Sequence, residues 1–178
     1  VKVCELTVAA TGLNEKAAQA AGLSYEKIVL SPLPHAGYYP GGKLMTMKVL
    51  YEKGSQRLLG AQIVGHEGVD KRIDVLATAM QAGLPVTALK DLDLAYAPPY
   101  ASAKDPVNLV GFMAENREQG VVKQFHWEDV AGLPRDGSVT LLDARTPGEY
   151  SGGCAEGFVN VPLDELRDHL GEIAPGKP

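Results

Sequence analysis

The chain has 178 residues, of which 45% are hydrophobic and 22% charged, a composition typical of folded globular proteins. This composition excludes a collagen-like repeat and a mostly disordered chain, and no apolar run is long enough to span a membrane. The net charge of −5 is uneven, because residues 1–120 hold 12 basic against 12 acidic side chains and the remainder holds 5 against 10. The asymmetry suggests two units. Without a basic patch of interleaved aromatics we expect neither a nucleic-acid nor a membrane partner.

The start of the chain and the two cysteines suggest where the protein works. Val1 to Leu6 contain no initiator Met and no secretory signal pattern, so we expect a piece of a longer, cytoplasmic protein. Cys4 and Cys154 stand far apart without the spacing of a disulfide framework or a zinc site, and we expect two free thiols. Cys4 falls in a strand pattern and is expected to be buried, whereas acidic neighbours argue against a reactive thiolate at Cys154.

Residues 1–119 form the first predicted unit, in which strand and helix patterns are mixed. Apolar alternation and compact apolar runs predict strands over residues 1–8, 25–30, 44–51 and 58–64. Helical spacing, with capping signals at Asn14 and at Asp105-Pro106, predicts helices over residues 15–21, 69–80, 86–92 and 106–118. This order predicts an α+β fold with a mainly antiparallel sheet of about four strands and three or four helices.

Residues 120–178 form the second predicted unit. Apolar runs predict strands over residues 139–142 and 158–161, and a helical pattern covers residues 162–170. This open βαβ pattern lacks the strands that would close a sheet around a core. We therefore expect exposed apolar side chains on its strands, at Val139, Leu141, Val159 and Val161.

Tyrosines concentrate in two loops that proline and glycine stiffen. Tyr38 and Tyr39 lie between His35 and Gly41, and Tyr96 and Tyr100 flank a Pro-Pro pair. A phenol on a rigid loop can donate a hydrogen bond or a proton to a reacting group. Loop tyrosines also cap a core or fill an interface, and the residues by themselves favour this structural role.

The other polar residues give weaker signals. The histidines lack the spacing of metal ligands, so no metal site is expected at any of them: His35, His66, His126 and His169. Asp143 and Arg145 follow a predicted strand, at the end where α/β folds place their sites. Lys71 and Arg72 are types that bind anions, but we expect them on a solvated helix face.

Five segments of the first unit carry a specific resemblance. They are Leu6-Thr7-Val8-Ala9-Ala10-Thr11-Gly12-Leu13-Asn14, Gly37-Tyr38-Tyr39-Pro40-Gly41, Leu59-Gly60-Ala61-Gln62-Ile63-Val64-Gly65, Asp70-Lys71-Arg72-Ile73-Asp74-Val75-Leu76-Ala77-Thr78-Ala79, and Leu94-Ala95-Tyr96-Ala97-Pro98-Pro99-Tyr100-Ala101-Ser102-Ala103-Lys104-Asp105-Pro106-Val107-Asn108. Residues 1 to about 117 thereby resemble the C-terminal dimerisation domain of FAD-dependent pyridine nucleotide-disulfide oxidoreductases, in the coenzyme A-disulfide reductase and NADH oxidase branch. The last segment is the most specific.

The second unit resembles the first half of a rhodanese domain. The resemblance lies in Leu141-Leu142-Asp143-Ala144-Arg145-Thr146-Pro147-Gly148-Glu149-Tyr150 and in Gly153-Cys154-Ala155-Glu156-Gly157-Phe158-Val159-Asn160-Val161-Pro162-Leu163-Asp164-Glu165-Leu166. Cys154 stands where that pattern usually has His, and the sulfur-carrying cysteine of the family would lie beyond this chain. The resemblance implies an incomplete α/β rhodanese-like segment over residues 120–178.

These resemblances imply a function for the parent protein. It would use FAD and NAD(P)H to reduce coenzyme A disulfide, persulfide or polysulfide, with the rhodanese segment delivering sulfur. This piece would form the homodimer, bind no cofactor by itself and be inactive alone, since it has neither a G-x-G-x-x-G turn nor a redox cysteine motif.

The resemblance also implies roles for the loop residues. Tyr38 and Tyr96 would act at the partner subunit's disulfide and flavin site, by stabilising or protonating a leaving coenzyme A thiolate. Tyr39 and Tyr100 are weaker candidates for the same role. Ala97, together with Pro98, would lie near the partner's flavin.

Two rival functions remain open at this point. The parent could reduce O₂ as an NADH oxidase, although a fused rhodanese segment argues against this. Alternatively, the chain could be a freestanding interaction module that binds a partner through its sheet and helix face. A dinucleotide-binding segment upstream of residue 1 in the gene would favour the enzyme.

Overall fold

The computed structural model describes residues 1–171 and residue 173. It divides into two compact units, residues 1–124 and residues 125–178, which we describe separately. The division by contacts falls a few residues after the composition shift at Gly120. In the part of the chain that the structure describes, no helix is long and apolar enough to cross a membrane.

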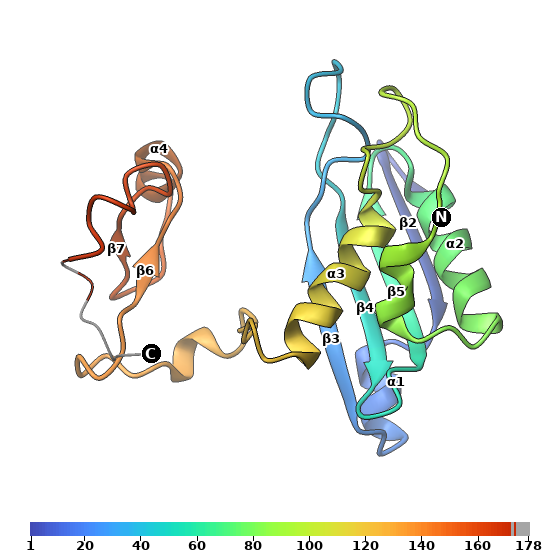
Figure 1. Cartoon of the computed structure of the whole chain (residues 1–178), viewed down its shortest axis with the longest axis horizontal. Coiled ribbons are helices and arrows are strands. Elements are labelled where there is room, and N and C mark those ends of the chain that lie inside the picture. Colours follow the sequence, from blue (N-terminus) through green and yellow to red (C-terminus); the bar gives the residue numbers. More distant parts are fainter. Residues whose placement is uncertain (172, 174–178) are drawn as a thin grey trace. The chain divides into compact units, whose positions relative to one another are not determined.

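The first unit is built on one five-stranded sheet (Figure 1). Its strands, in spatial order, are β1 (Lys2–Val3), β2 (Leu6–Gly12), β5 (Leu58–Gly65), β4 (Thr46–Glu52) and β3 (Tyr25–Leu30). Every neighbouring pair is antiparallel. The α+β prediction is thus confirmed, with one strand more than expected.

Helices cover the sheet unequally. The helices of this unit are α1 (Glu15–Ala20), α2 (Val69–Gln81), the 3₁₀ helix η1 (Val86–Asp91) and α3 (Pro106–Glu118). In one core, α2, η1 and α3 pack on the sheet face that carries Met47, Val49 and Ile63. The short α1 packs on the opposite face, where Ala18 contacts a cluster with Leu50. Alternate residues of β4 therefore serve two cores, as the period of a strand requires.

The helix starts follow their capping signals. The Asn14 side chain accepts a hydrogen bond from the Ala17 amide at 2.8 Å. Asp105 caps α3 through the Val107 amide at 3.0 Å, and the Asn108 side chain accepts from the Asp105 amide at 3.0 Å. Both predicted caps are confirmed, because each satisfies amides that the first helical turn leaves without partners.

The opening strand differs from its prediction. It folds back on itself as the β1–β2 hairpin, with Lys2 opposite Thr7 and Val3 opposite Leu6. Cys4 lies in the turn with φ of 52° and is exposed, so its expected burial is wrong. The alternating pattern could not reveal this, since either half of a tight hairpin keeps the same alternation.

The second unit has little regular structure. Strands β6 (Leu142–Asp143) and β7 (Val159–Asn160) pair in parallel, with α4 (Pro147–Ser151) between them in sequence and the 3₁₀ helix η2 (Val130–Gly132) before them. Turns occupy residues 163–170, so the predicted helix over residues 162–170 is wrong. Val159 is 62% exposed, as expected. The other three strand residues of that prediction are half-buried: Val139, Leu141 and Val161.

One ion pair organises the end of β6. The Arg145 Nε donates to Asp143 Oδ1 at 2.9 Å, and its Nη2 donates to Oδ2 at 2.6 Å. The same guanidinium donates to the Gly153 carbonyl at 2.9 Å. The pair lowers the pKa of Asp143, and it holds the segment after α4 against the strand end.

Candidate functional site

Two loops at one end of the first unit carry the candidate site. The first tyrosine loop, residues 31–45, joins β3 to β4, and the second, residues 92–104, joins η1 to α3. Figure 1 shows both loops extending from the same end of the sheet. The Ala36 amide donates to the Ala101 carbonyl at 3.2 Å, so the two loop backbones are joined directly.

The structure brings Tyr38 and Tyr96 together across 58 positions of sequence. Their hydroxyl oxygens lie 3.3 Å apart, and either phenol can be the donor. The hydrogen bond to Tyr38, with partial desolvation, raises the pKa of Tyr96. Whichever hydroxyl donates to the other, the accepting phenol keeps its own hydrogen available. The pair therefore offers a neutral O–H donor to a ligand near pH 7.

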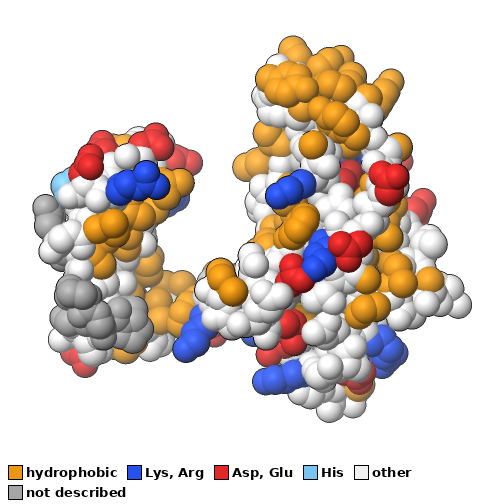
Figure 2. All heavy atoms as spheres, in the orientation of Figure 1, with side chains coloured by type: hydrophobic (Ala, Val, Ile, Leu, Met, Phe, Trp, Pro, Cys, Tyr) orange, Lys and Arg blue, Asp and Glu red, His pale blue; other side chains and the backbone are white. Residues whose placement is uncertain are grey.

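All four loop tyrosines are exposed, Tyr38 and Tyr100 more than the other two. The exposed fractions are 76% for Tyr38, 42% for Tyr39, 50% for Tyr96 and 72% for Tyr100, and Leu44 nearby in the first loop is 62% exposed. Figure 2 shows hydrophobic side chains gathered over the end of the unit that the two loops form. An apolar surface with polar hydroxyl tips is typical of a protein interface or a ligand site.

The two weaker candidates lie differently. The Tyr39 ring meets the nearly buried His35 ring edge to face, with centroids 5.5 Å apart. Gly42 lies directly beside this imidazole, and a Cβ at Gly42 would come 2.9 Å from its Cε1 atom. Tyr39 is thus packed into its own loop, whereas the structure gives the Tyr100 side chain no comparable ring contact among the described residues.

Ala97 and Pro98 form the turn of the second loop. The Ala97 carbonyl accepts hydrogen bonds from the Tyr100 amide at 2.9 Å and from the Ala101 amide at 3.0 Å. Both residues are half-buried. The turn is held by its backbone, and its two small apolar residues directly follow Tyr96 in sequence.

Sequence reasoning missed the group beneath the loops. Arg72 of α2 is only 1% exposed and pairs with Asp105, so the expectation of a solvated face is wrong for this residue. A signal was present: position 72 lies three residues after Val69 and four before Leu76, on the buried stripe of the helix. Lys71, on the next position, is partly exposed and lies 3.6 Å from Asp105 Oδ2.

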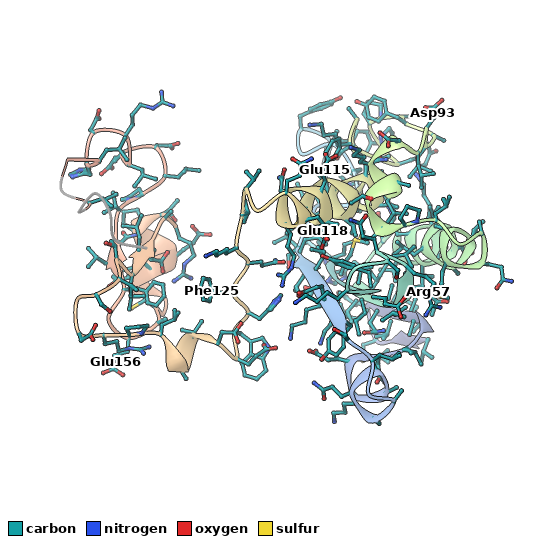
Figure 3. The ribbon with its side chains drawn as sticks, turned by 60° about the horizontal axis from the view of Figure 1, so that its bottom comes forward. Arg57, Asp93, Glu115, Glu118, Phe125 and Glu156 are labelled. Atoms are coloured by element: carbon teal, nitrogen blue, oxygen red, sulfur yellow. The ribbon has the colours of Figure 1, made fainter. Side chains whose placement is uncertain are left out.

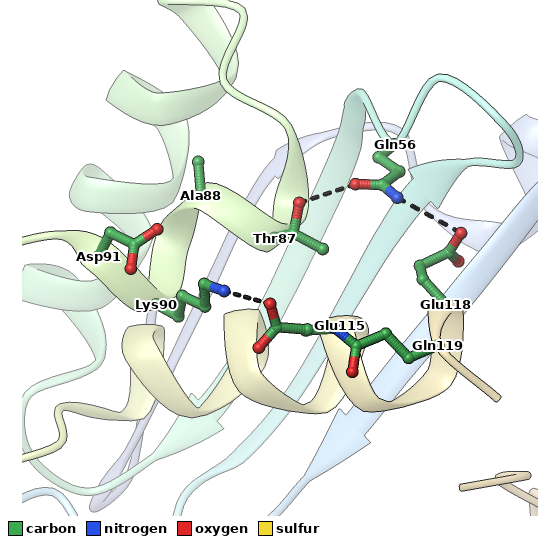
Figure 4. Close-up of a pocket in the computed structure, with 8 residues that line it drawn as sticks. All are labelled: Gln56, Thr87, Ala88, Lys90, Asp91, Glu115, Glu118 and Gln119. Atoms are coloured by element: carbon green, nitrogen blue, oxygen red, sulfur yellow. Dashed lines mark hydrogen bonds and ion pairs between the residues drawn. The ribbon is translucent and has the colours of Figure 1, made fainter. Parts of the chain in front are cut away.

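Away from the tyrosine loops, a hollow of about 410 Å³ lies between η1, α3 and the β4–β5 hairpin (Figure 4). Its polar groups bind one another: Lys90 pairs with Glu115, and Gln56 donates to Glu118 at 3.4 Å while accepting from Thr87 at 2.7 Å. Figure 3 shows Glu115 and Glu118 one turn apart on α3. Most of the polar groups that line the hollow are thus engaged with one another.

Neither unit offers a metal site in the residues that the structure describes, where no three His, Cys, Asp or Glu side chains are placed around one point. Cys154 is an exposed free thiol in the second unit. Its hydrogen bond raises the pKa of Tyr150, whose hydroxyl also donates to the Phe158 carbonyl at 2.9 Å.

The fold and the loops together define a class of protein. An antiparallel sheet with three helices on one face and the short α1 on the other defines an α+β domain, and its exposed aromatic end is of the kind found at protein interfaces. The family model of the pyridine nucleotide-disulphide oxidoreductase dimerisation domain matches residues 1–106, and the chain belongs to this family.

Relatives agree with this assignment. A coenzyme A disulfide reductase of Staphylococcus epidermidis is 40% identical over 115 residues, which cover 65% of this chain and 26% of that protein. The chain thus spans about a quarter of the length of the curated relatives that it matches.

Two solved structures extend the likeness to nearly the whole chain. The reduced Bacillus anthracis CoADR-RHD is 46% identical with a TM-score of 0.92, covering 99% of this chain and 31% of that one. A NAD-dependent persulfide reductase from A. fulgidus is 39% identical with a TM-score of 0.86, covering 97% and 31%.

Proposed function

We propose that this chain is part of a flavin-dependent NAD(P)H oxidoreductase that reduces coenzyme A disulfide, a persulfide or a polysulfide. Residues 1–119 would form a homodimer and lend Tyr38 and Tyr96 to the partner subunit's site. The observation that carries the proposal is the exposed pair of phenols, 3.3 Å apart at the tip of a dimerisation domain. The names of two relatives, a coenzyme A disulfide reductase and a persulfide reductase, suggest the substrate class.

The phenols suit the stabilisation of a thiolate. A phenol has an ordinary pKa of about 10 and a thiol one of about 8.5, so complete proton transfer from Tyr to a thiolate is uphill near pH 7. A hydrogen bond from the phenol to the departing sulfur lowers its energy without that transfer. The pKa of Tyr96 is raised, so its hydroxyl keeps its proton near pH 7 and remains a neutral donor. The released thiolate would then take its proton from solvent.

The loop residues fit the edge of a flavin site that another chain segment completes. Ala97 and Pro98 present small half-buried apolar groups, which allow close approach of a planar ring, and the phenols supply donors beside it. The sequence contains no glycine-rich turn that would hold the phosphates of FAD or NAD(P)H. When bound, the flavin would supply the electrons; this chain would orient the sulfur substrate and exclude water.

The second unit would be the first half of a rhodanese domain, over residues 120–178. Its support is the parallel β6–α4–β7 unit and the ion pair between Asp143 and Arg145 at the end of the first strand. The rhodanese segment would deliver sulfane sulfur to the reductase site, and Cys154 would not carry it.

The homodimer is tested by light scattering on the 178-residue chain across a concentration series. A particle of twice the 18.9 kDa of one chain is expected. The matched variants are Tyr38→Glu, which places a charge in the exposed aromatic end, and Lys16→Glu, which places the same charge on α1. Loss of the dimer with the first variant alone would support the proposal. A monomer at all concentrations would refute dimerisation through this unit alone.

The catalytic role is tested in the protein encoded by the complete gene. Flavin absorbance and NADH or NADPH oxidation with coenzyme A disulfide establish the reaction, and oxygen consumption without disulfide would indicate the rival NADH oxidase. Tyr96→Phe should lower the rate of disulfide reduction, while Tyr25→Phe, far from the loops, should not. A Tyr96→Phe enzyme as fast as wild type would refute the role of this phenol.

A further inference from the structure

A buried ionic group lies beneath the two tyrosine loops. Arg72 is 1% exposed and Asp105 is 2% exposed. The Arg72 Nε donates to Asp105 Oδ1 at 3.3 Å, and Nη2 donates to Oδ2 at 2.8 Å. The two charges therefore neutralise each other in a two-point geometry, which a flexible ammonium would not reproduce.

Arg72 also reaches both loop backbones. Its Nη2, which donates to Asp105 as well, shares its two hydrogens among Asp105, the Pro34 carbonyl at 2.6 Å in the first tyrosine loop and the Tyr100 carbonyl at 3.2 Å in the second. Pro34 precedes Tyr38 by four residues, and Tyr100 follows Tyr96 by four residues. One planar guanidinium thus contacts both loops, four residues along the chain from each of the two phenols that meet at 3.3 Å.

The surroundings leave the guanidinium one position. Nη1 donates to the Gly68 carbonyl at 3.2 Å, and a Cβ at Gly68 would lie 2.0 Å from this nitrogen. Asp105 is fixed in turn, because it caps α3 and its amide is held by Asn108. The Arg72–Asp105 ion pair, which we call the anchor, is therefore held rigidly both on the side of α2 and on the side of α3.

We propose that Arg72 is a positioning residue, whose guanidinium sets the separation of the two tyrosine loops so that Tyr38 and Tyr96 act as one hydrogen-bonded pair. A pair of apolar side chains of similar volume, in place of both Arg72 and Asp105, would fill the space and often gives equal stability. It would supply no donor to either loop carbonyl. The catalytic use of this positioning rests on the proposed function, whereas the positioning itself belongs to this chain alone.

The first experiment uses the 178-residue chain with ring-labelled tyrosine and follows the Tyr96 phenol by NMR as pH is raised. Tyr38→Phe assigns the titration of an unpaired Tyr96. Arg72→Lys is expected to shift the Tyr96 pKa downward to that reference. The matched control, Val49→Ala in the core of the sheet, lowers stability without touching the loops and should leave the titration as in wild type.

The result that overturns the proposal is a wild-type Tyr96 titration in folded Arg72→Lys. If Arg72→Lys does not fold, Gly68→Ala decides, because its methyl group displaces the guanidinium and leaves both charges in place. A wild-type Tyr96 titration in Gly68→Ala would equally overturn the proposal. An equal shift of the Tyr96 pKa in Val49→Ala would show that a general loss of stability causes the shift. That result would also overturn the proposal.

The complete enzyme separates this inference from the proposed function. There, Arg72→Lys should lower kcat/KM for disulfide by about tenfold, the size of one weakened hydrogen bond. Adding Arg72→Lys to Tyr96→Phe should cost nothing more, since both disrupt the same hydrogen-bonded pair of phenols. If the NMR shift occurs but Tyr96→Phe keeps the wild-type rate, the positioning stands and the proposed function fails. Additive losses in the double variant would refute action through Tyr96.

Discussion

The carboxylate of Glu15 gives a prediction whose size can be worked from the structure. It lies in the first turn of α1 and is only 19% exposed. Lys27 Nζ donates to it at 2.7 Å, Tyr25 donates at 3.0 Å, and Lys48 forms a second ion pair. Partial burial raises its pKa, but these donors outweigh burial and lower the pKa from the ordinary 4.5 to about 2.

Glu15 has a lower pKa in the folded chain than in the unfolded chain. Its ionised form therefore stabilises the folded state at pH values above the pKa of the unfolded chain. This stabilisation is complete above about pH 4.5 and is lost as the pH falls through about 2, because the unfolded chain binds the proton first. A shift of this size corresponds to at most about 3 kcal/mol, and solvent screening near the surface reduces it to about 1–2 kcal/mol. Glu15→Gln should lose that amount at pH 7 and almost nothing at pH 2.

Urea unfolding followed by far-UV circular dichroism at a series of pH values measures this difference. Tryptophan fluorescence is unsuitable, since Trp127 lies outside the first unit. Glu5→Gln is the matched control, because Glu5 is 82% exposed and lies 3.8 Å from Lys43. If Glu15→Gln and wild type differ by the same free energy at pH 7 and pH 2, the linkage argument is wrong.

Three further changes test other parts of the structure. Gly60→Ala should lower the melting temperature by several degrees, as measured by circular dichroism, because its Cβ would lie 2.1 Å from the backbone oxygen of Leu13. Asn14→Ala should cost about 1 kcal/mol of unfolding free energy in urea, since α1 loses its cap; no loss would mean that the cap is redundant. Tyr38→Phe should lower the pKa of Tyr96 in an NMR titration, and an unchanged pKa would contradict the phenol pair.

Local signals were sufficient for most of the first unit. The caps at Asn14 and Asp105 act within four residues of sequence, so the helices that they begin could be predicted from side-chain chemistry alone. The β4–β5 hairpin could also be predicted from the sequence, because a short polar connection separates two apolar runs. These features depend on neighbours in sequence, which is all that a single sequence displays.

The features that were missed depend on neighbours in space. Residues 162–170 carry a helical pattern, but none of them is fully buried, and residues 163–170 form turns. In the sequence, Arg72 is a charged residue among the polar residues of a helix. Its burial results from contacts with Asp105 and the loop carbonyls, which are distant in sequence. The contact between Tyr38 and Tyr96 likewise arises only when two distant loops meet.

The candidate site has an exposed part, the phenols, and a buried part, the Arg72–Asp105 pair, whose hydrogen bonds differ in strength. The phenols lie in solvent, where a hydrogen bond between them is too weak to hold two loops in register. The Arg72–Asp105 pair is buried, where each bond is directional and an unmade one is costly. A displacement of about 1 Å at a reacting group can reduce a rate a hundredfold, so a site on loops gains from an anchor that resists sliding. The ionic anchor is therefore best explained by the position that it imposes on the tyrosines, and less by the stability that it adds.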